Sequence, residues 1–174
     1  MQIESYHKHF DSYFNSPLIR NQIRESVEIV KNSKRIFFIG NGGSNSICSH
    51  MMEDYAKMGR FPTFAFSDAA LITCFANDYG YERAMEEWLK VHFVPGDLLV
   101  AISSSGESKN ILNAVQHANS INGNVISLSG FKEGNALSRM AKVNFYLPAS
   151  NYGIVECFHQ VILHLVLDMI TNTN

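Results

Sequence analysis

Five short apolar runs, separated by segments of helical length, restrict this chain to a small set of folds. The runs are rich in β-branched and aromatic residues and are nearly continuous rather than alternating, which is typical of strands covered on both faces. Strands separated by helices predict a parallel sheet with right-handed crossovers. We therefore expect an α/β fold, a three-layer αβα sandwich around a five-stranded parallel sheet, with its strands within residues 35–40, 62–67, 97–103, 124–130 and 143–149.

The segments between these runs carry apolar residues at helical spacing. They predict helices over residues 44–58, 81–93, 108–120 and 154–170, with one or two more before residue 31. The last helix has more apolar residues than one buried stripe requires, and such a surplus often marks a subunit interface. We expect one domain over residues 1–174, with an N-terminal helical segment (1–32) that serves oligomerisation and an α/β core (33–172). The protein is predicted to be a homo-oligomer.

Composition argues against several classes of function. The formal net charge is -2, and its acids and bases are scattered, so the basic surface of a nucleic-acid binder is missing. The cysteines Cys48, Cys74 and Cys157 are too dispersed for a disulfide framework and indicate a reducing compartment. No signal peptide is visible, and no apolar stretch approaches the roughly 20 residues of a spanning helix. We expect a cytoplasmic protein without a nucleic-acid or membrane partner.

Two glycine- and serine-rich loops follow the first and third apolar runs, where loops of a parallel sheet lead into helix N-termini. They are GNGGSNS (40–46) and SSSGESKN (103–110). Glycine lets the backbone approach an anion closely, and hydroxyl and free N–H groups donate hydrogen bonds to phosphate oxygens. Ser44 and Ser108 could instead be plain helix N-caps. Two such loops, one with three consecutive hydroxyls, favour anion binding.

Neither loop matches a nucleotide-binding motif. The Walker pattern is absent from the chain, and the dinucleotide pattern fails because Asn45 occupies its third glycine position. Hydroxyl groups in place of a lysine indicate a sugar phosphate rather than a triphosphate.

A second set of candidate residues combines histidines with carboxylates. His50 and Asp54 are four residues apart and share a helix face, while Glu156 and His164 are eight apart on the last predicted helix. If the two helices meet, these side chains could hold a divalent metal such as zinc, or supply a carboxylate base and an imidazole acid for moving a proton between adjacent carbons. Other histidines are interpreted as a packed residue (His159) or as surface residues (His7, His9, His92 and His117).

These motifs resemble those of the sugar isomerase (SIS) domain proteins, and within them the phosphoheptose isomerases, over residues 17–170. The matching segments are GNGGS with His50 six residues after its serine, FANDYGYE at 75–82, PGDLLVAISSSGES at 95–108, and ExxHxxxxH from Glu156 to His164. The resemblance implies a flavodoxin-like or Rossmann-like fold and a homotetramer with active sites at subunit interfaces. It also implies conversion of sedoheptulose 7-phosphate into D-glycero-D-manno-heptose 7-phosphate, for bacterial surface polysaccharides such as lipopolysaccharide or capsule.

The loops and the resemblance together give a set of candidate site residues. Phosphate or substrate contacts are expected from Asn41, Gly42, Ser44, Asp68, Asn77, Asp78, Ser103, Ser104, Ser105, Ser108 and Glu156. One divalent ion, with zinc the expected metal, would be held by His50, Asp54, Glu156 and His164. The implied reaction is an aldose–ketose isomerisation through a cis-enediol, with Asp54 as the base and His164 as the acid. Asp54 is thus a candidate for two roles that conflict.

Two residues depart from the family pattern. The family's catalytic carboxylate is usually glutamate where this chain has Asp54, and Glu53 beside it would be the counterpart only if the helix were rotated. The usual glutamine on the last helix is replaced by Glu156. The added charge should tighten a divalent cation and repel an anionic enediolate, unless a bound metal offsets the repulsion. Two alternatives stay open: isomerisation of another ketose or aldose phosphate, or a non-catalytic SIS protein that binds phosphosugars or engages a replication initiator protein.

Overall fold

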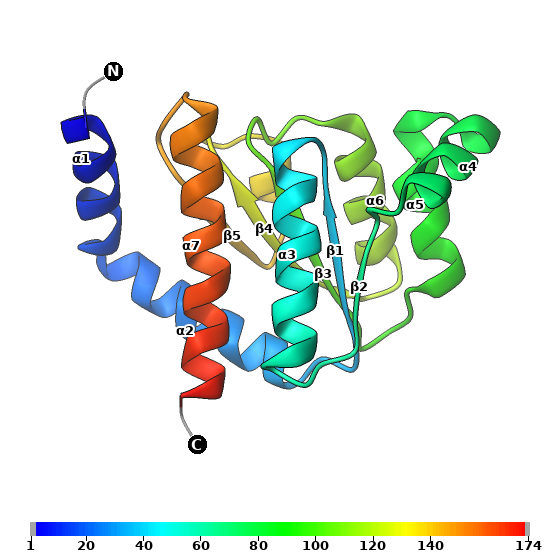
Figure 1. Ribbon diagram of the computed structural model, residues 1–174, viewed down its shortest axis with the longest axis horizontal. Helices are drawn as coiled ribbons and strands as arrows, with labels where there is room; N and C mark the ends of the chain where they lie inside the picture. The colour runs from blue at the N-terminus through cyan, green and yellow to red at the C-terminus, as the bar shows by residue number, and fades with distance from the viewer. Residues whose placement is uncertain (1–2, 173–174) are drawn as a thin grey trace.

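The computed structural model describes residues 3–172 as three layers, with a central sheet between two layers of helices (Figure 1). Five parallel strands form the sheet in the order β2-β1-β3-β4-β5, which confirms the predicted fold class. The strands are β1 (Ile36–Gly40), β2 (Thr63–Ala65), β3 (Leu98–Ser103), β4 (Asn124–Ser129) and β5 (Val143–Tyr146).

Helices cover both faces of this sheet. One layer contains α2, α3 and α7, and the other contains α5 and α6 (Figure 1). The helices are α1 (Ile3–Phe14), α2 (Pro17–Lys31), α3 (Gly43–Lys57), α4 (Ala69–Tyr79), α5 (Tyr81–His92), α6 (Lys109–Ser120) and α7 (Tyr152–Thr171), with a short 3-10 helix at Leu137–Arg139.

The central strands are buried throughout, which explains their nearly continuous apolar sequences. Every residue of β1 and β3 is buried. Because side chains alternate along a strand, Phe38 packs into the core beneath α2, α3 and α7, while Phe37 and Ile39 pack into the core beneath α5 and α6. Because both faces of such a strand contact an apolar core, apolar and polar residues do not alternate along it.

Strand pairing brings the two serine-glycine loops together. In the β1–β3 register Gly40 lies opposite Ile102, so the loops that follow start at neighbouring points of one sheet edge. Gly40 leaves room for the close return of the chain into α3, since a Cβ there would lie 2.8 Å from the backbone carbon and oxygen of Ser44. This edge of the sheet positions the site.

Helix α4 was not predicted from the sequence. Its first turn is capped by Asp68, whose carboxylate accepts a hydrogen bond from the Leu71 amide (3.0 Å), and it ends at Gly80 with φ of 78°. No residue of α4 is fully buried. The helix therefore lacks the core-facing stripe on which a prediction from periodicity depends.

Two expectations from the sequence, one on membrane-spanning segments and one on exposed histidines, need correction. Helix α7 is long and apolar enough, with a mean hydropathy of 1.5, to meet the length and composition of a bilayer span, contrary to the expectation that no stretch does. Half of it is buried within the fold, as in the core helix of a globular protein. Among the histidines interpreted as surface residues, His7 and His92 are exposed, but His9 and His117 are half-buried.

Candidate functional site

A cavity of about 130 Å³ opens at the sheet edge where β1 and β3 end. We call it the serine pocket. Both predicted loops contribute to it, and so does the start of α7. It is lined by Asn41, Ser44, Ile102, Ser103, Ser104, Ser105, Ser108, Tyr152 and Glu156. Seven of the predicted phosphate and substrate contacts are therefore brought together in a single cavity.

Three helices begin at the serine pocket. The residues preceding their first turns are Gly42 for α3, Ser108 for α6 and Asn151 for α7. The first N–H groups of a helix have no partner within the helix and carry a partial positive charge. Helix N-termini grouped in this way favour an anion in the space between them.

The serine hydroxyls are not used as helix caps. Ser44 lies inside α3, and the side chain of Ser108 makes no capping hydrogen bond; its hydroxyl instead accepts one from Ser103 (3.1 Å). The hydroxyl of Ser104 is buried and has no hydrogen-bond partner among the described residues. Buried polar groups rarely stay unpaired in native proteins. A ligand with acceptor oxygens in the pocket would satisfy this hydroxyl.

The charges at the serine pocket are unusual for an anion site. No lysine or arginine is among its lining residues, and Glu156 contributes a carboxylate. That carboxylate lies against the start of α3, because a Cβ on Gly43 would come within 2.6 Å of both of its oxygens. The positive end of α3 offsets part of the charge of Glu156. Anion binding here depends on backbone N–H and hydroxyl groups.

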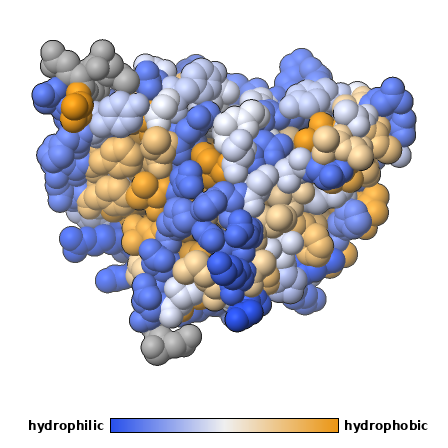
Figure 2. Space-filling view, in the orientation of Figure 1, coloured by the Kyte–Doolittle hydropathy of each residue, from blue (hydrophilic) through white to orange (hydrophobic). Residues whose placement is uncertain are grey.

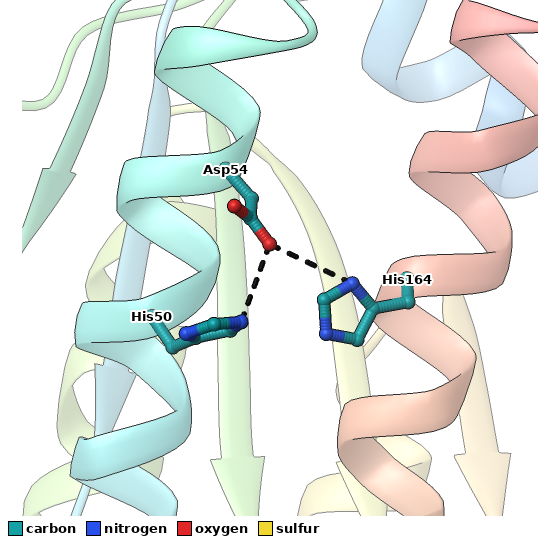
Figure 3. Close-up of side chains that lie close together, drawn as sticks. All are labelled: His50, Asp54 and His164. Carbon is teal, nitrogen blue, oxygen red and sulfur yellow. Dashed lines mark ion pairs between the residues drawn. The ribbon is translucent and has the colours of Figure 1, made fainter.

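A compact cluster of His50, Asp54 and His164 lies farther along α3 and α7 (Figure 3). Oδ2 of Asp54 is 3.3 Å from Nε2 of His50 and 3.6 Å from Nδ1 of His164. One ligand atom from each residue lies within 4.8 Å of the others. Two imidazoles and one carboxylate are a donor set that suits zinc, with a coordination position left for water or substrate.

Helices α3 and α7 meet, as the predicted cluster required. They run side by side (Figure 1), and the buried hydroxyl of Tyr55 on α3 donates to the carbonyl oxygen of Leu163 on α7 (2.9 Å). Glu156, expected as a fourth metal ligand, does not join the three residues of the cluster; its carboxylate lines the serine pocket instead.

The remaining candidates lie outside both features. Asp68 caps α4, and Asn77 and Asp78 are exposed near the end of that helix, where Asn77 donates to Asp78 (2.9 Å). None of the three is among the residues that line the serine pocket. The fourth, Gly42, precedes α3 with φ of 53°. His159 is fully buried, consistent with its interpretation as a packed residue.

The sequence analysis missed three residues at this site. Tyr152 lines the serine pocket, and Tyr81 and Asn110 hydrogen-bond the side chain of Asn41. Two of them were visible in quoted motifs, since Tyr81 belongs to FANDYGYE and Asn110 closes SSSGESKN. Their role depends on contacts between segments far apart in the chain, which motif spacing does not report.

Comparison with known proteins agrees with this architecture. A sequence profile of the SIS domain family matches residues 15–130. Phosphoheptose isomerase of Fusobacterium nucleatum is 33% identical over 147 residues, covering 80% of this chain and 74% of that protein. The phosphoheptose isomerase of Hamiltonella defensa is 34% identical over 150 residues, covering 83% of this chain and 72% of that protein.

Solved structures show the same fold. The structure of a phosphoheptose isomerase from Francisella tularensis matches with a TM-score of 0.84 at 28% identity, covering 97% of this chain and 94% of that one. That from Neisseria gonorrhoeae matches with a TM-score of 0.87 at 24% identity, covering 96% and 94%. The chain therefore belongs to the SIS domain family and is an aldose–ketose isomerase of phosphosugars, related to the phosphoheptose isomerases.

Proposed function

We propose that this protein converts sedoheptulose 7-phosphate into D-glycero-D-manno-heptose 7-phosphate. One observation carries the proposal: the serine pocket and the His50–Asp54–His164 cluster are both built on α3 and α7. Ser44 and His50 are six residues apart on α3, which corresponds to roughly 9 Å along the helix. An extended sugar phosphate can have its phosphate in the pocket and its carbonyl end near the cluster.

In this proposal the serine pocket holds the phosphate and orients the sugar. Ser44, Ser104, Ser105 and Ser108 donate to phosphate oxygens, together with backbone N–H groups at the starts of α3 and α6. Ser103 donates to the hydroxyl of Ser108 and so orients it. Binding without a cation lets the product leave, since a charge-assisted pair would hold the phosphate more strongly. Glu156 lies where it can accept a hydrogen bond from a sugar hydroxyl. Asp68, Asn77 and Asp78 would contribute from an adjoining subunit.

The cluster performs the proton transfers. A carboxylate oxygen of Asp54 takes the proton from C1, the C–H electron pair forms the C1–C2 double bond, and the C2 carbonyl oxygen gains a proton from His164. Return of the first proton to C2, with loss of the O1 proton to His164, gives the aldose. General acid–base groups of this kind contribute about 10²- to 10⁴-fold each.

The donor set of the cluster also fits a divalent ion. His50, Asp54 and His164 would hold it, and when bound it would polarise the sugar carbonyl as a Lewis acid. We propose zinc because imidazole and carboxylate ligands suit it. Asp54 is then a candidate both for coordinating the ion and for taking the proton, and metal analysis of Asp54→Asn tests the first role separately from turnover.

We further propose a cytoplasmic homotetramer with active sites at subunit interfaces, serving the synthesis of a surface polysaccharide. Supporting this assembly, Figure 2 shows a hydrophobic area on the face that carries α1 and α7. A groove between these helices and α2 is lined by the apolar residues Phe14, Ile19, Ile23, Leu165 and Met169 together with Arg20 and Arg24. Exposed apolar residues that gather on one face often mark a protein–protein contact.

The test is a panel of pentose, hexose and heptose phosphates, incubated with the purified protein in D2O. Proton NMR reports isomerisation and deuterium uptake at the carbon that exchanges. We expect sedoheptulose 7-phosphate to turn over fastest, and faster turnover of a pentose or hexose phosphate would assign the chain to that substrate instead. Elemental analysis of the same sample is expected to give one zinc per chain.

A pair of neighbouring carboxylates provides the control. Asp54→Asn should lower turnover about 10²- to 10⁴-fold, whereas Glu53→Gln, which changes an exposed residue outside the cluster, should leave turnover within about twofold. Equal rates for the two variants would remove Asp54 from the mechanism. Loss of activity in Glu53→Gln alone would identify Glu53 as the family's glutamate.

A further inference from the structure

The side-chain amide of Asn41 is held by two residues that do not line the serine pocket. Its Oδ1 accepts hydrogen bonds from the hydroxyl of Tyr81 (2.7 Å) and from Nδ2 of Asn110 (2.8 Å). Its Nδ2 donates to Oδ1 of Asn110 (3.0 Å). The three residues come from the loop after β1, from the start of α5 and from the first turn of α6.

A count of donors and acceptors shows what remains for a ligand. A primary amide has two N–H donors and an oxygen that accepts two hydrogen bonds. Tyr81 and Asn110 occupy both acceptor positions of Asn41, and Asn110 takes one donor. A reciprocal amide pair uses the N–H on the same side as the carbonyl oxygen, so the N–H that points away from that oxygen is left. Asn41 itself lines the serine pocket, where this N–H can meet a ligand.

The arrangement of neighbouring cavities supports an orientation in which the free N–H of Asn41 faces the serine pocket. Tyr81 and Asn110 line a second hollow of about 290 Å³, which shares Asn41 and Ser108 with the serine pocket. Both partners of the Asn41 amide therefore come from residues of the second hollow. A donor of Asn41 that faces the serine pocket would join the unpaired hydroxyl of Ser104 there.

The two supporting residues differ in how firmly the fold holds them. Asn110 is 4% exposed, whereas Tyr81 is 53% exposed, so its ring lies largely outside the core. Removing the Tyr81 hydroxyl therefore changes the orientation of Asn41 at little cost to folding, since substitutions at exposed positions usually have small effects on stability. Tyr81→Phe can therefore test how Asn41 is positioned without destabilising the fold.

We propose that Tyr81 and Asn110 are positioning residues that fix the Asn41 amide so that its free N–H donates to the phosphate of a phosphosugar in the serine pocket. The inference rests on the proposed phosphate site. Neither residue needs to touch the substrate. Tyr81 and Asn110 act through Asn41. Substituting either residue should therefore have no effect on phosphate binding once the Asn41 amide has been removed.

The main experiment measures binding, and steady-state kinetics give a second readout. Calorimetry with inorganic phosphate and with a hexitol 6-phosphate, which has no carbonyl group and cannot isomerise, gives dissociation constants for wild type and Tyr81→Phe. We expect binding about three- to tenfold weaker in Tyr81→Phe, the range for loss of one hydrogen bond. The melting temperature should be unchanged. The loss should appear mainly in KM for the substrate, as expected for an interaction present in both ground and transition states.

Tyr79→Phe is the matched control. Tyr79 is also about half exposed and lies two residues earlier, with its ring against Phe75 (ring centroids 5.8 Å apart). The same loss of a hydroxyl there should leave the dissociation constants unchanged. Asn110→Asp, which replaces the donor to Asn41 with a carboxylate oxygen, should weaken phosphate binding more than Tyr81→Phe does.

A double-mutant cycle decides whether Tyr81 acts through Asn41. Asn41→Ala alone should weaken phosphate binding, and adding Tyr81→Phe to it should cause no further loss. A full additional loss in the double variant would overturn the inference, because Tyr81 would then contact the ligand itself. Unchanged affinity in Tyr81→Phe would also overturn it while leaving the phosphate site intact. If wild type binds neither probe, the phosphate site and the inference both fail; binding without isomerisation removes only the proposed reaction.

Discussion

Helix α7 carries two histidines in contrasting environments. His159 is completely buried, and neither ring nitrogen forms a well-aligned hydrogen bond with a described residue. The side chain of His164 is 37% exposed, and its ring lies beside Asp54 and His50. The two positions are five residues apart, which at 3.6 residues per turn places them about 140° apart around the helix. One therefore faces the core, and the other faces helix α3.

The difference shows that helical phase, rather than residue type, decides what a histidine can do. Burial lowers the pKa of His159 to about 4, and a weak contact with the backbone of Ser129 offsets only part of that shift. The ring of His159 is therefore neutral at physiological pH and has no charged partner among residues 3–172. His164 faces a carboxylate that belongs to another helix. A chemical role for His159 would contradict this comparison, as would a purely structural role for His164.

The largest expected effect separates the two histidines by activity. His164→Ala should lower turnover about 10²- to 10⁴-fold, because it removes the proposed acid and one metal ligand. Its melting temperature should stay close to that of wild type, since the side chain is partly exposed. Steady-state kinetics and a thermal melt on the same sample check both. His159→Leu should show the reverse pattern, with altered stability and near-normal turnover.

Metal binding gives the second contrast. A ligand that binds only the folded state stabilises it by about 2.7 kcal/mol at a concentration of one hundred times its dissociation constant. Zinc should therefore raise the melting temperature of wild type and of His159→Leu, but not that of His164→Ala. Calorimetry with and without EDTA measures the shift. Equal zinc stabilisation in His164→Ala would place the metal elsewhere.

Acid should lower the stability of the fold through His159. The folded-state pKa of His159 is lowered from 6.5 to about 4, so the unfolded chain binds more protons between these values. Stability should therefore fall as pH decreases through this window, by about 2 kcal/mol between pH 7 and pH 5. Urea unfolding at the two pH values measures it, and the drop in wild type should exceed that in His159→Leu by this amount. An equal drop in both proteins would assign the loss to other groups.

The smallest expected effect concerns the contact that joins α3 to α7. Tyr55→Phe removes the buried hydrogen bond that the Tyr55 hydroxyl donates to the carbonyl oxygen of Leu163. It should lower the free energy of unfolding by about 1 kcal/mol. Turnover should fall only slightly if packing alone keeps His164 near Asp54. A loss as large as that of His164→Ala would show that this bond sets the geometry of the cluster.

The sequence was sufficient for the parts that depend on local pattern. The apolar runs gave the five strands, and the serine-glycine loops lie at helix starts as predicted, because strand and helix periodicity fix which side chains are covered. Helix α4 was not predicted because none of its residues is fully buried. Glu156 was expected with the histidines because it shares α7 with His164, but eight residues of helix rise place it at the serine pocket instead. The Tyr81–Asn41–Asn110 contacts join three segments, and no local pattern encodes them.

Both contacts between Asp54 and the histidines use the same oxygen, Oδ2, and Figure 3 shows Oδ1 directed away from both rings. The two oxygens of a single carboxylate thus have different surroundings. The conflict between holding a cation and abstracting a proton is eased if each task falls to a different oxygen. Asp54 has one methylene group fewer than the glutamate that is usual in the family, but it has the same two carboxylate oxygens. The substitution would then change how far the carboxylate extends and leave its chemistry the same.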